Sequence, residues 1–172
     1  MIRFRKRKGQ QGQSLVEVAL FLPLVLILIA GVTEIGQMLL TTNRVQTAVR
    51  AATRFGSNGG EDAGMVIVGL NSVTQTLELD SSRWDMWVIR GTVNDQGTGI
   101  DNWEFNHAYG DGLTQRFAEV DETEIRNDVL ASLQQDYGQS GAADIQFVGS
   151  HALFDAESIL GFETYLSDVY FM

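Results

Sequence analysis

Cysteine is absent from the 172 residues, and proline occurs only once, at Pro23. The lack of cysteine excludes disulfides, thiolate metal sites and a cysteine nucleophile. Basic residues are also few, because 12 Lys and Arg stand against 22 Asp and Glu, for a formal net charge of −10. Nucleic-acid binding relies on lysine and arginine to neutralise phosphates, so we expect no nucleic-acid partner. The length suits one domain, or one domain with an appended segment.

The few basic residues are concentrated at the N-terminus. Residues 1–12 hold three arginines and both lysines of the chain and no acid, whereas residues 57–172 hold 20 acids and four arginines. Between them, residues 18–32 carry no charge, and the apolar character continues to Leu40. A membrane-spanning helix needs about 20 apolar residues, which this segment provides. By the positive-inside rule, residues 1–12 stay cytoplasmic and the acidic remainder lies outside.

Two other readings of the apolar segment are a buried helix of a soluble core and a cleavable secretory signal. A soluble core helix seldom follows five clustered cations, and a signal would end at small residues such as Ala30 and Gly31. Apolar residues instead recur at helical spacing well beyond that point, which predicts one retained helix from near Ser14 to near Phe55. At 1.5 Å per residue it would measure about 63 Å, longer than a bilayer is thick, so its outer half should pack on the acidic domain or on other helices. The recurring residues are Ile35, Met38, Leu39, Thr42, Val45, Val49 and Ala52.

Three residues of this helix are candidates for function. Glu17 is a carboxylate at the start of an apolar helix, which indicates a functional partner or a headgroup-level acid favoured by the helix dipole. Glu34 is either an ordinary carboxylate at the outer membrane face or a buried charge directed toward Arg44 or Arg50 of a neighbouring chain. Pro23 removes one helical hydrogen bond, and it is either a tolerated membrane proline or a point of helix flexibility.

The segment GQSLVEVALFLPLVLILIAGVTEIGQMLLTTNRVQTAVRAATRFGS, with the basic stretch before it, resembles the N-terminal segment of TadE-like proteins. These are pilin-like components of the tight-adherence (Flp) branch of type IV pilus systems. The resemblance covers about a third of the chain. It includes the basic leader ending in Gly12, the GQSLVE run, the Leu-Pro pair at 22–23, the TEIG run at 33–36 and the arginine-containing exit at 48–55. One departure is Val18, where the family pattern usually has phenylalanine.

The resemblance implies a mechanism. A prepilin peptidase would cut after Gly12 and leave Gln13 as the mature N-terminus. The carboxylate of Glu17 would then pair with the Gln13 α-amino group of a neighbouring subunit and fix the register of helix packing. The implied partners are the prepilin peptidase, other pilin subunits, the pilus assembly platform and the inner membrane, and the implied role is a filament subunit that supports adhesion. The alternative is a non-polymerising, single-pass, membrane-anchored extracellular binding or accessory module.

The fold class expected is α+β: a leader (1–12), a long helix (13–56) and an exported α+β domain (57–172). Glycine and asparagine at 57–60 should break the long helix. Asp121, with Glu124 three residues later, predicts a helix start, and Gly138 and Gly141 should end that helix. The C-terminal stretch from 159 is aromatic-rich and is left unassigned. The other expected elements are a helix over 62–78, strands over 84–93, 103–109 and 144–154, and a turn over 94–99.

Catalytic motifs are missing from the sequence, so we expect no enzyme and no cofactor. The only histidines, His107 and His151, are expected to be surface or strand residues rather than catalytic bases. An acidic cluster interleaved with glycines offers oxygen atoms of the kind that bind Ca²⁺, but it lacks EF-hand spacing, and turn formation explains it better. We therefore expect no metal site. The cluster comprises Asp95, Asp101, Glu104 and Asp111.

Overall fold

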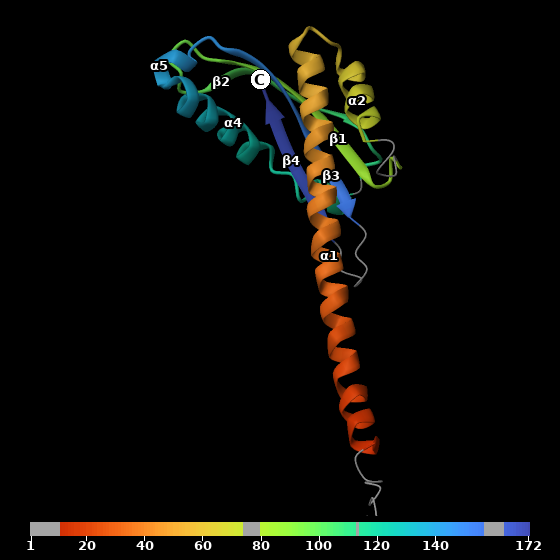
Figure 1. Cartoon of the computed structure of the whole chain (residues 1–172). Coiled ribbons are helices and arrows are strands. Elements are labelled where there is room, and N and C mark those ends of the chain that lie inside the picture. The colour runs from red at the N-terminus through yellow and green to blue at the C-terminus, as the bar shows by residue number, and fades with distance from the viewer. Residues whose placement is uncertain (1–10, 74–79, 113, 157–163) are drawn as a thin grey trace, which may run out of the picture.

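The computed structural model describes residues 11–73, 80–112, 114–156 and 164–172, and it has the predicted α+β fold. A long helix extends from one side of a small domain built on a single sheet (Figure 1). The helices are α1 (Gln11–Ser57), α2 (Asp62–Asn71), α3 (Thr114–Phe117), α4 (Glu122–Tyr137) and α5 (Gln139–Ala142). The strands are β1 (Trp84–Val93), β2 (Ile100–Tyr109), β3 (Gln146–Ala156) and β4 (Thr164–Phe171).

Helix α1 is continuous over 47 residues and is slightly longer than the predicted 14–55. It passes through Pro23 without interruption. The helix ends at the predicted glycine-rich break, where Gly59 adopts a φ of +85° that disfavours side chains with a Cβ. The Asn58 side chain donates a hydrogen bond of 2.7 Å to the carbonyl of Arg54 and so satisfies one of the last helical carbonyls. One rigid element therefore joins the apolar segment to the domain.

The sheet contains four antiparallel strands in the order β2-β1-β3-β4. Strand β1 is buried along nearly its whole length, because α1 and α2 cover one face of the sheet and α4 covers part of the other. The predicted turn over 94–99 is confirmed: the Asn94 side chain accepts a hydrogen bond from the Thr98 backbone at 2.8 Å. Strand β2 begins at Ile100, three residues earlier than predicted, and β3 extends to Ala156. The stretch left unassigned contains edge strand β4.

Two apolar cores lie on opposite faces of this sheet. The larger core joins the end of α1 to α2 and to one face of β1 and β3, and the smaller core joins α4 to the other face. Because the last turns of α1 supply the larger core, this helix is an integral part of the domain. The larger core contains Val45, Ala48, Val49, Ala52, Met65, Leu70, Trp84, Met86, Val88, Ala152 and Phe154, and the smaller contains Ile89, Ile125, Val129, Leu133 and Phe147.

The two shorter helices predicted from sequence are both present, with one difference in length. Helix α2 starts at the predicted residue but ends at Asn71, with a turn at 72–73, and the remainder of the predicted 62–78 lies outside the described residues. Helix α4 starts as predicted, since the Asp121 carboxylate accepts hydrogen bonds from the backbone of Thr123 and Glu124 at 2.9 and 3.1 Å. It ends at Gly138, whose φ is +73°. The prediction for Gly141 was wrong, because this residue lies inside α5.

Candidate functional site

The apolar half of α1, residues 15–40, is the most unusual surface of the molecule. Twelve large apolar side chains between Leu15 and Ile29 are 46–73% exposed. The mean hydropathy of this helix reaches 2.8, and none of its most apolar 18-residue window is buried in the domain. A soluble protein rarely exposes an apolar surface of this extent, so a membrane or other chains must cover it. By length and composition α1 is suited to be a single-pass membrane anchor.

The predicted processing and register residues all lie near the start of this helix. Gly12 and Gln13 belong to the first turn of α1. Glu17 is exposed and lies beside an apolar surface formed by Val18, Phe21, Leu22 and Val25. A carboxylate in these surroundings requires a polar or charged neighbour when the surface is covered by lipid or by other helices.

The predicted apolar stripe of α1 divides into two parts. Val45, Val49 and Ala52 are buried against the sheet, whereas Ile35 and Leu39 are 61% and 62% exposed. Met38 and Thr42 are partly exposed, so the stripe is fully buried only from Val45 onward. Ile35 and Leu39 remain available for packing against another helix.

Arg50, a predicted interhelical partner of Glu34, is engaged within its own chain. Its guanidinium lies 5.6 Å from the centre of the Tyr170 ring on β4, a cation–π distance. Burial raises the pKa of the neighbouring Asp168, and the charge of Arg50 opposes that rise. Glu34 and Arg44 are partly exposed on α1. Whether Glu34 pairs with an arginine of a neighbouring chain stays a prediction.

Two buried hydroxyl groups fix the end of α1 to the sheet. Thr53 Oγ1 lies 2.9 Å from Ser150 Oγ on β3, and it donates to the carbonyl of Tyr170 at 3.1 Å. Ser150 Oγ donates to the carbonyl of Val49 at 2.8 Å. This contact could not be predicted from the sequence, because a threonine in an amphipathic helix carries no sign of a partner on a distant strand.

A buried ionic cluster stabilises the segment that follows β2. The Asp85 carboxylate is fully buried, lies 3.3 Å from the equally buried Arg116 and accepts from the Gly112 backbone at 3.1 Å. His107 Nε2 lies 2.9 Å from the same carboxylate, so this histidine, expected on a strand, is on β2 and has a structural partner. The cluster joins groups that are far apart in sequence and was not predicted.

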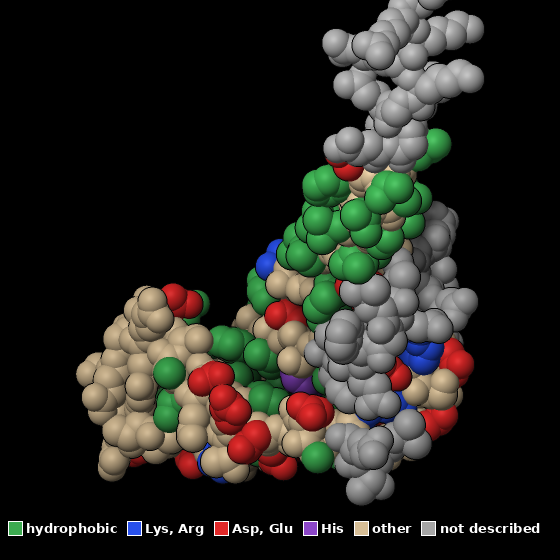
Figure 2. Space-filling view, turned by 90° about the horizontal axis from the view of Figure 1, so that it is seen from below, with side chains coloured by type: hydrophobic (Ala, Val, Ile, Leu, Met, Phe, Trp, Pro, Cys, Tyr) green, Lys and Arg blue, Asp and Glu red, His purple; other side chains and the backbone are tan. Residues whose placement is uncertain are grey.

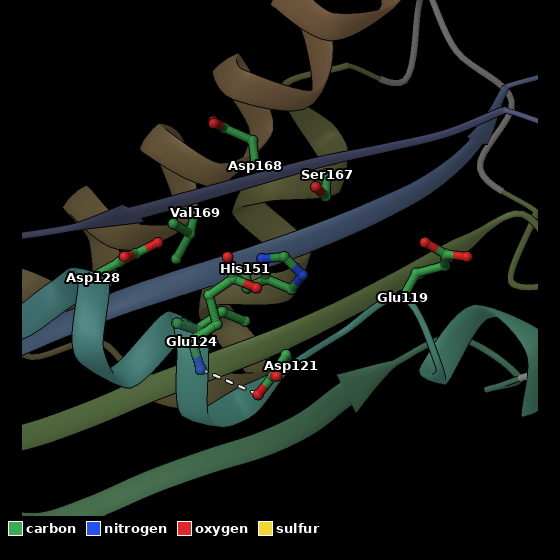
Figure 3. A pocket seen from close by; sticks show the side chains of 9 residues that line it. Glu119, Asp121, Glu124, Asp128, His151, Ser167, Asp168 and Val169 are labelled. Carbon is green, nitrogen blue, oxygen red and sulfur yellow. Dashed lines mark hydrogen bonds between the residues drawn. The ribbon is translucent and has the colours of Figure 1, made fainter.

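His151 is buried on β3 beneath an acidic pocket of about 310 Å³ (Figure 3). Its ring is 5% exposed and contacts Trp87, with ring centres 5.3 Å apart. Neither ring nitrogen makes a hydrogen bond of normal geometry within the described part of the chain, but the Asp168 backbone lies close enough to act on the ring. Burial lowers the pKa of His151 to about 4, so the ring is neutral at pH 7. The expectation of a strand residue is confirmed, but its position is interior.

Carboxylates surround this pocket. Glu119 and the first turns of α4 supply most of them, while Ser167 and Val169 of β4 form the opposite wall. Figure 3 shows the side chain of Asp168, also on β4, directed away from the pocket toward α1. Seen from the side of the apolar half of α1, acidic side chains gather on this face of the domain around exposed apolar atoms (Figure 2). The acidic residues that line the pocket are Glu119, Asp121, Glu124, Asp128 and Asp168.

The acidic residues considered for calcium are spread along the β1–β2 hairpin. Asp95 lies in the turn, Asp101 and Glu104 are exposed on β2, and Asp111 follows that strand. Over the described ranges, no three His, Asp or Glu side chains are grouped closely enough to hold a metal ion. Turn and strand positions account for these residues.

Residues 12–54 match the family model of TadE-like proteins. The match covers about a quarter of the chain and lies wholly within α1, so it includes Gly12, Gln13, Glu17 and Pro23. No curated protein and no solved structure matches the chain. The resemblance seen in the sequence is thereby confirmed for the helix, and the sheet domain lies outside the matched region. The N-terminal helix of this protein is therefore similar to TadE-like proteins over residues 12–54.

Proposed function

We propose that this protein is a pilin-like subunit of a tight-adherence pilus. The observation that carries the proposal is the exposed apolar surface of α1 with the carboxylate of Glu17 near its beginning. Proteins of the TadE-like pilus family are not enzymes, which agrees with a structural role. In the membrane, lipid covers the apolar half, and in a filament neighbouring helices replace the lipid.

The orientation and processing follow from the charge distribution and the family pattern. The leader (1–12) stays in the cytoplasm, the helix (13–56) crosses the inner membrane, and the acidic domain (57–172) lies outside. A prepilin peptidase removes the leader after Gly12. The new α-amino group of Gln13 then pairs with Glu17 of a neighbouring subunit, because two opposite charges in an apolar bundle are tolerated only as a pair. The assembly platform draws the subunit into a filament that supports adhesion.

Mass spectrometry of the protein in sheared surface filaments tests this proposal. The expected result is a mature chain that starts at Gln13 and is present in the filament fraction. A protein that keeps Met1 in cells with an active prepilin peptidase, and that stays in the membrane fraction while filaments are sheared off, would contradict it. That second result would favour the non-polymerising, membrane-anchored accessory module.

A further inference from the structure

The acidic pocket above His151 has the properties of a binding site for an organic cation. A buried polar group without a hydrogen-bond partner is unfavourable. Neither nitrogen of this ring makes a hydrogen bond of normal geometry within the described chain, and the Asp168 backbone can satisfy one of them at most. The ring lies between the side chains of Glu119 and Glu124 and is directed into the pocket (Figure 3). A neutral imidazole offers one acceptor nitrogen, so a donor that enters the pocket would satisfy it.

A guanidinium group fits these surroundings better than a metal ion does. The described carboxylates are not grouped closely enough to coordinate a metal. A guanidinium carries five N–H donors in a planar fork and can bond to several separated acceptors at once. Ile125 and Val169 add an apolar wall that suits the methylene stem of an arginine side chain.

Arg54 is the available source of such a group. Among the arginines that the structure describes, Arg54 alone has no hydrogen bond, ion pair or ring contact of its side chain with another described residue, and it is exposed. It lies in the last turn of α1. That turn is at the end of the domain farthest from the apolar half of the helix, whereas α4 begins on the side that faces this half (Figure 1).

We propose that the pocket binds the guanidinium of Arg54 from a second copy of this chain, in a contact that rests on the proposed assembly into filaments. Glu124 and Glu119 accept its N–H groups at the rim, and His151 accepts at the floor. Donor and acceptor lie on opposite ends of the domain, so the contact is head to tail. Such a contact leaves a free Arg54 at one end of every oligomer and a free pocket at the other, so further copies of the chain can be added.

Cysteine crosslinking of the full-length chain tests the contact, because the natural sequence contains no cysteine that would interfere. The test variant carries Ser57→Cys with Asp128→Cys, which keeps Arg54, Glu124 and His151 in place, and the matched control carries Ser57→Cys with Asp136→Cys. Asp136 is an exposed carboxylate at the far end of α4, outside the pocket. All three positions are exposed, so the substitutions should leave the fold intact. A short bismaleimide applied to intact cells joins the two thiols beside the contact.

The test variant is expected to give a ladder of dimers, trimers and larger species, and the control is expected to give none. If the protein is present in sheared filaments but the two variants crosslink equally or not at all, the Arg54 contact is refuted while the filament role stands. If the ladder forms in membranes but no filament contains the protein, the contact stands and the filament role fails.

Charge exchange gives a second, independent readout. Arg54→Glu and Glu124→Arg should each lower the amount of this protein in sheared filaments by about tenfold or more, and the double variant should recover part of it. Normal incorporation of Arg54→Glu would overturn the inference. Agmatine, a free guanidinium compound, gives the last check. If it raises the melting temperature of the domain only when Glu124 is present, and no crosslinked ladder forms, the pocket binds a free guanidinium compound and the inference is overturned.

Discussion

Among single residues, Asp85 is a fully buried carboxylate that depends on a counter-ion. Its carboxylate and the guanidinium of Arg116 are both removed from water and are paired at 3.3 Å. A buried ion pair adds little net stability over an apolar pair, but removal of one partner leaves the other charge buried without compensation. Removing the charge of Asp85 without changing the shape of its side chain should therefore lower the free energy of unfolding strongly.

We predict that Asp85→Asn lowers the free energy of unfolding by about 3–5 kcal/mol, since Arg116 would lose its counter-ion. Denaturant titration of the full-length protein in detergent, followed by circular dichroism, measures the change. The matched control is Asp62→Asn, which breaks the partly exposed pair with Arg90 at 2.8 Å. This control should cost less than about 1 kcal/mol. An equal decrease in the free energy of unfolding in both variants would show that burial does not make the Asp85–Arg116 pair more important for stability.

His151 gives the domain a dependence on pH. Burial lowers its pKa from 6.5 to about 4, so the unfolded chain binds this proton more readily than the folded one. The stabilisation is complete above pH 6.5 and is lost as the pH falls toward 4, which amounts to about 2–3 kcal/mol between pH 7 and pH 4.5. In His151→Phe, whose ring can occupy the same space beside Trp87, the loss of stability over this range should be smaller by that amount. Denaturant titrations of both proteins at the two pH values measure it, and identical pH dependence would contradict the assignment.

At the scale of elements, α1 has two different environments along one uninterrupted helix. Its first part is exposed and apolar, and its last turns form one wall of the larger core. The transition occurs near Val45, where the side chains first become buried. The hydrogen bonds of the Thr53 hydroxyl fix the rotation of α1 about its axis and its position along the sheet. Apolar packing alone would define both less precisely.

Thr53→Val tests this contact at nearly constant volume. Its removal leaves Ser150 Oγ and the carbonyl of Tyr170 without their buried partner, so the free energy of unfolding should fall by about 1–3 kcal/mol. The control is Thr47→Val, because Thr47 is exposed and bonds only to the carbonyl of Asn43 in the same helix, at 2.8 Å. It should change stability by about 0.5 kcal/mol or less. Both values come from denaturant titration, and a neutral Thr53→Val would show that apolar packing alone positions α1.

For the molecule overall, the features that could be predicted from the sequence are those with a local signal. Continuous hydropathy predicted α1, the glycine-rich break predicted its end, and the Asp121 cap predicted the start of α4. Strand β4 was left unassigned, because its edge position gives a weak alternation between apolar and polar residues. The pocket and the Asp85–Arg116 pair were not predicted, since each depends on segments that only the folded sheet brings together.

The assembly role predicts a selective defect for Glu17→Ala. Membrane insertion should be unaffected, because the apolar half of α1 becomes more apolar, but incorporation into filaments should be lost by roughly tenfold or more once the charge partner of Gln13 is removed. Immunoblots of membrane and sheared-filament fractions measure both quantities. Glu34→Ala is the matched control, since we expect Glu34 at the outer membrane face, and it should enter filaments nearly normally. Wild-type incorporation of Glu17→Ala would refute the register role.

The continuity of α1 has a mechanical consequence. A membrane anchor joined to its domain by a loose linker absorbs a pull by stretching the linker first. Here the same helix that is held at one end forms core contacts through Val45, Val49 and Ala52 at the other. A tensile load on the anchor therefore reaches the interior of the domain directly. The lifetime of the attachment under force is then set by how slowly that interior comes apart.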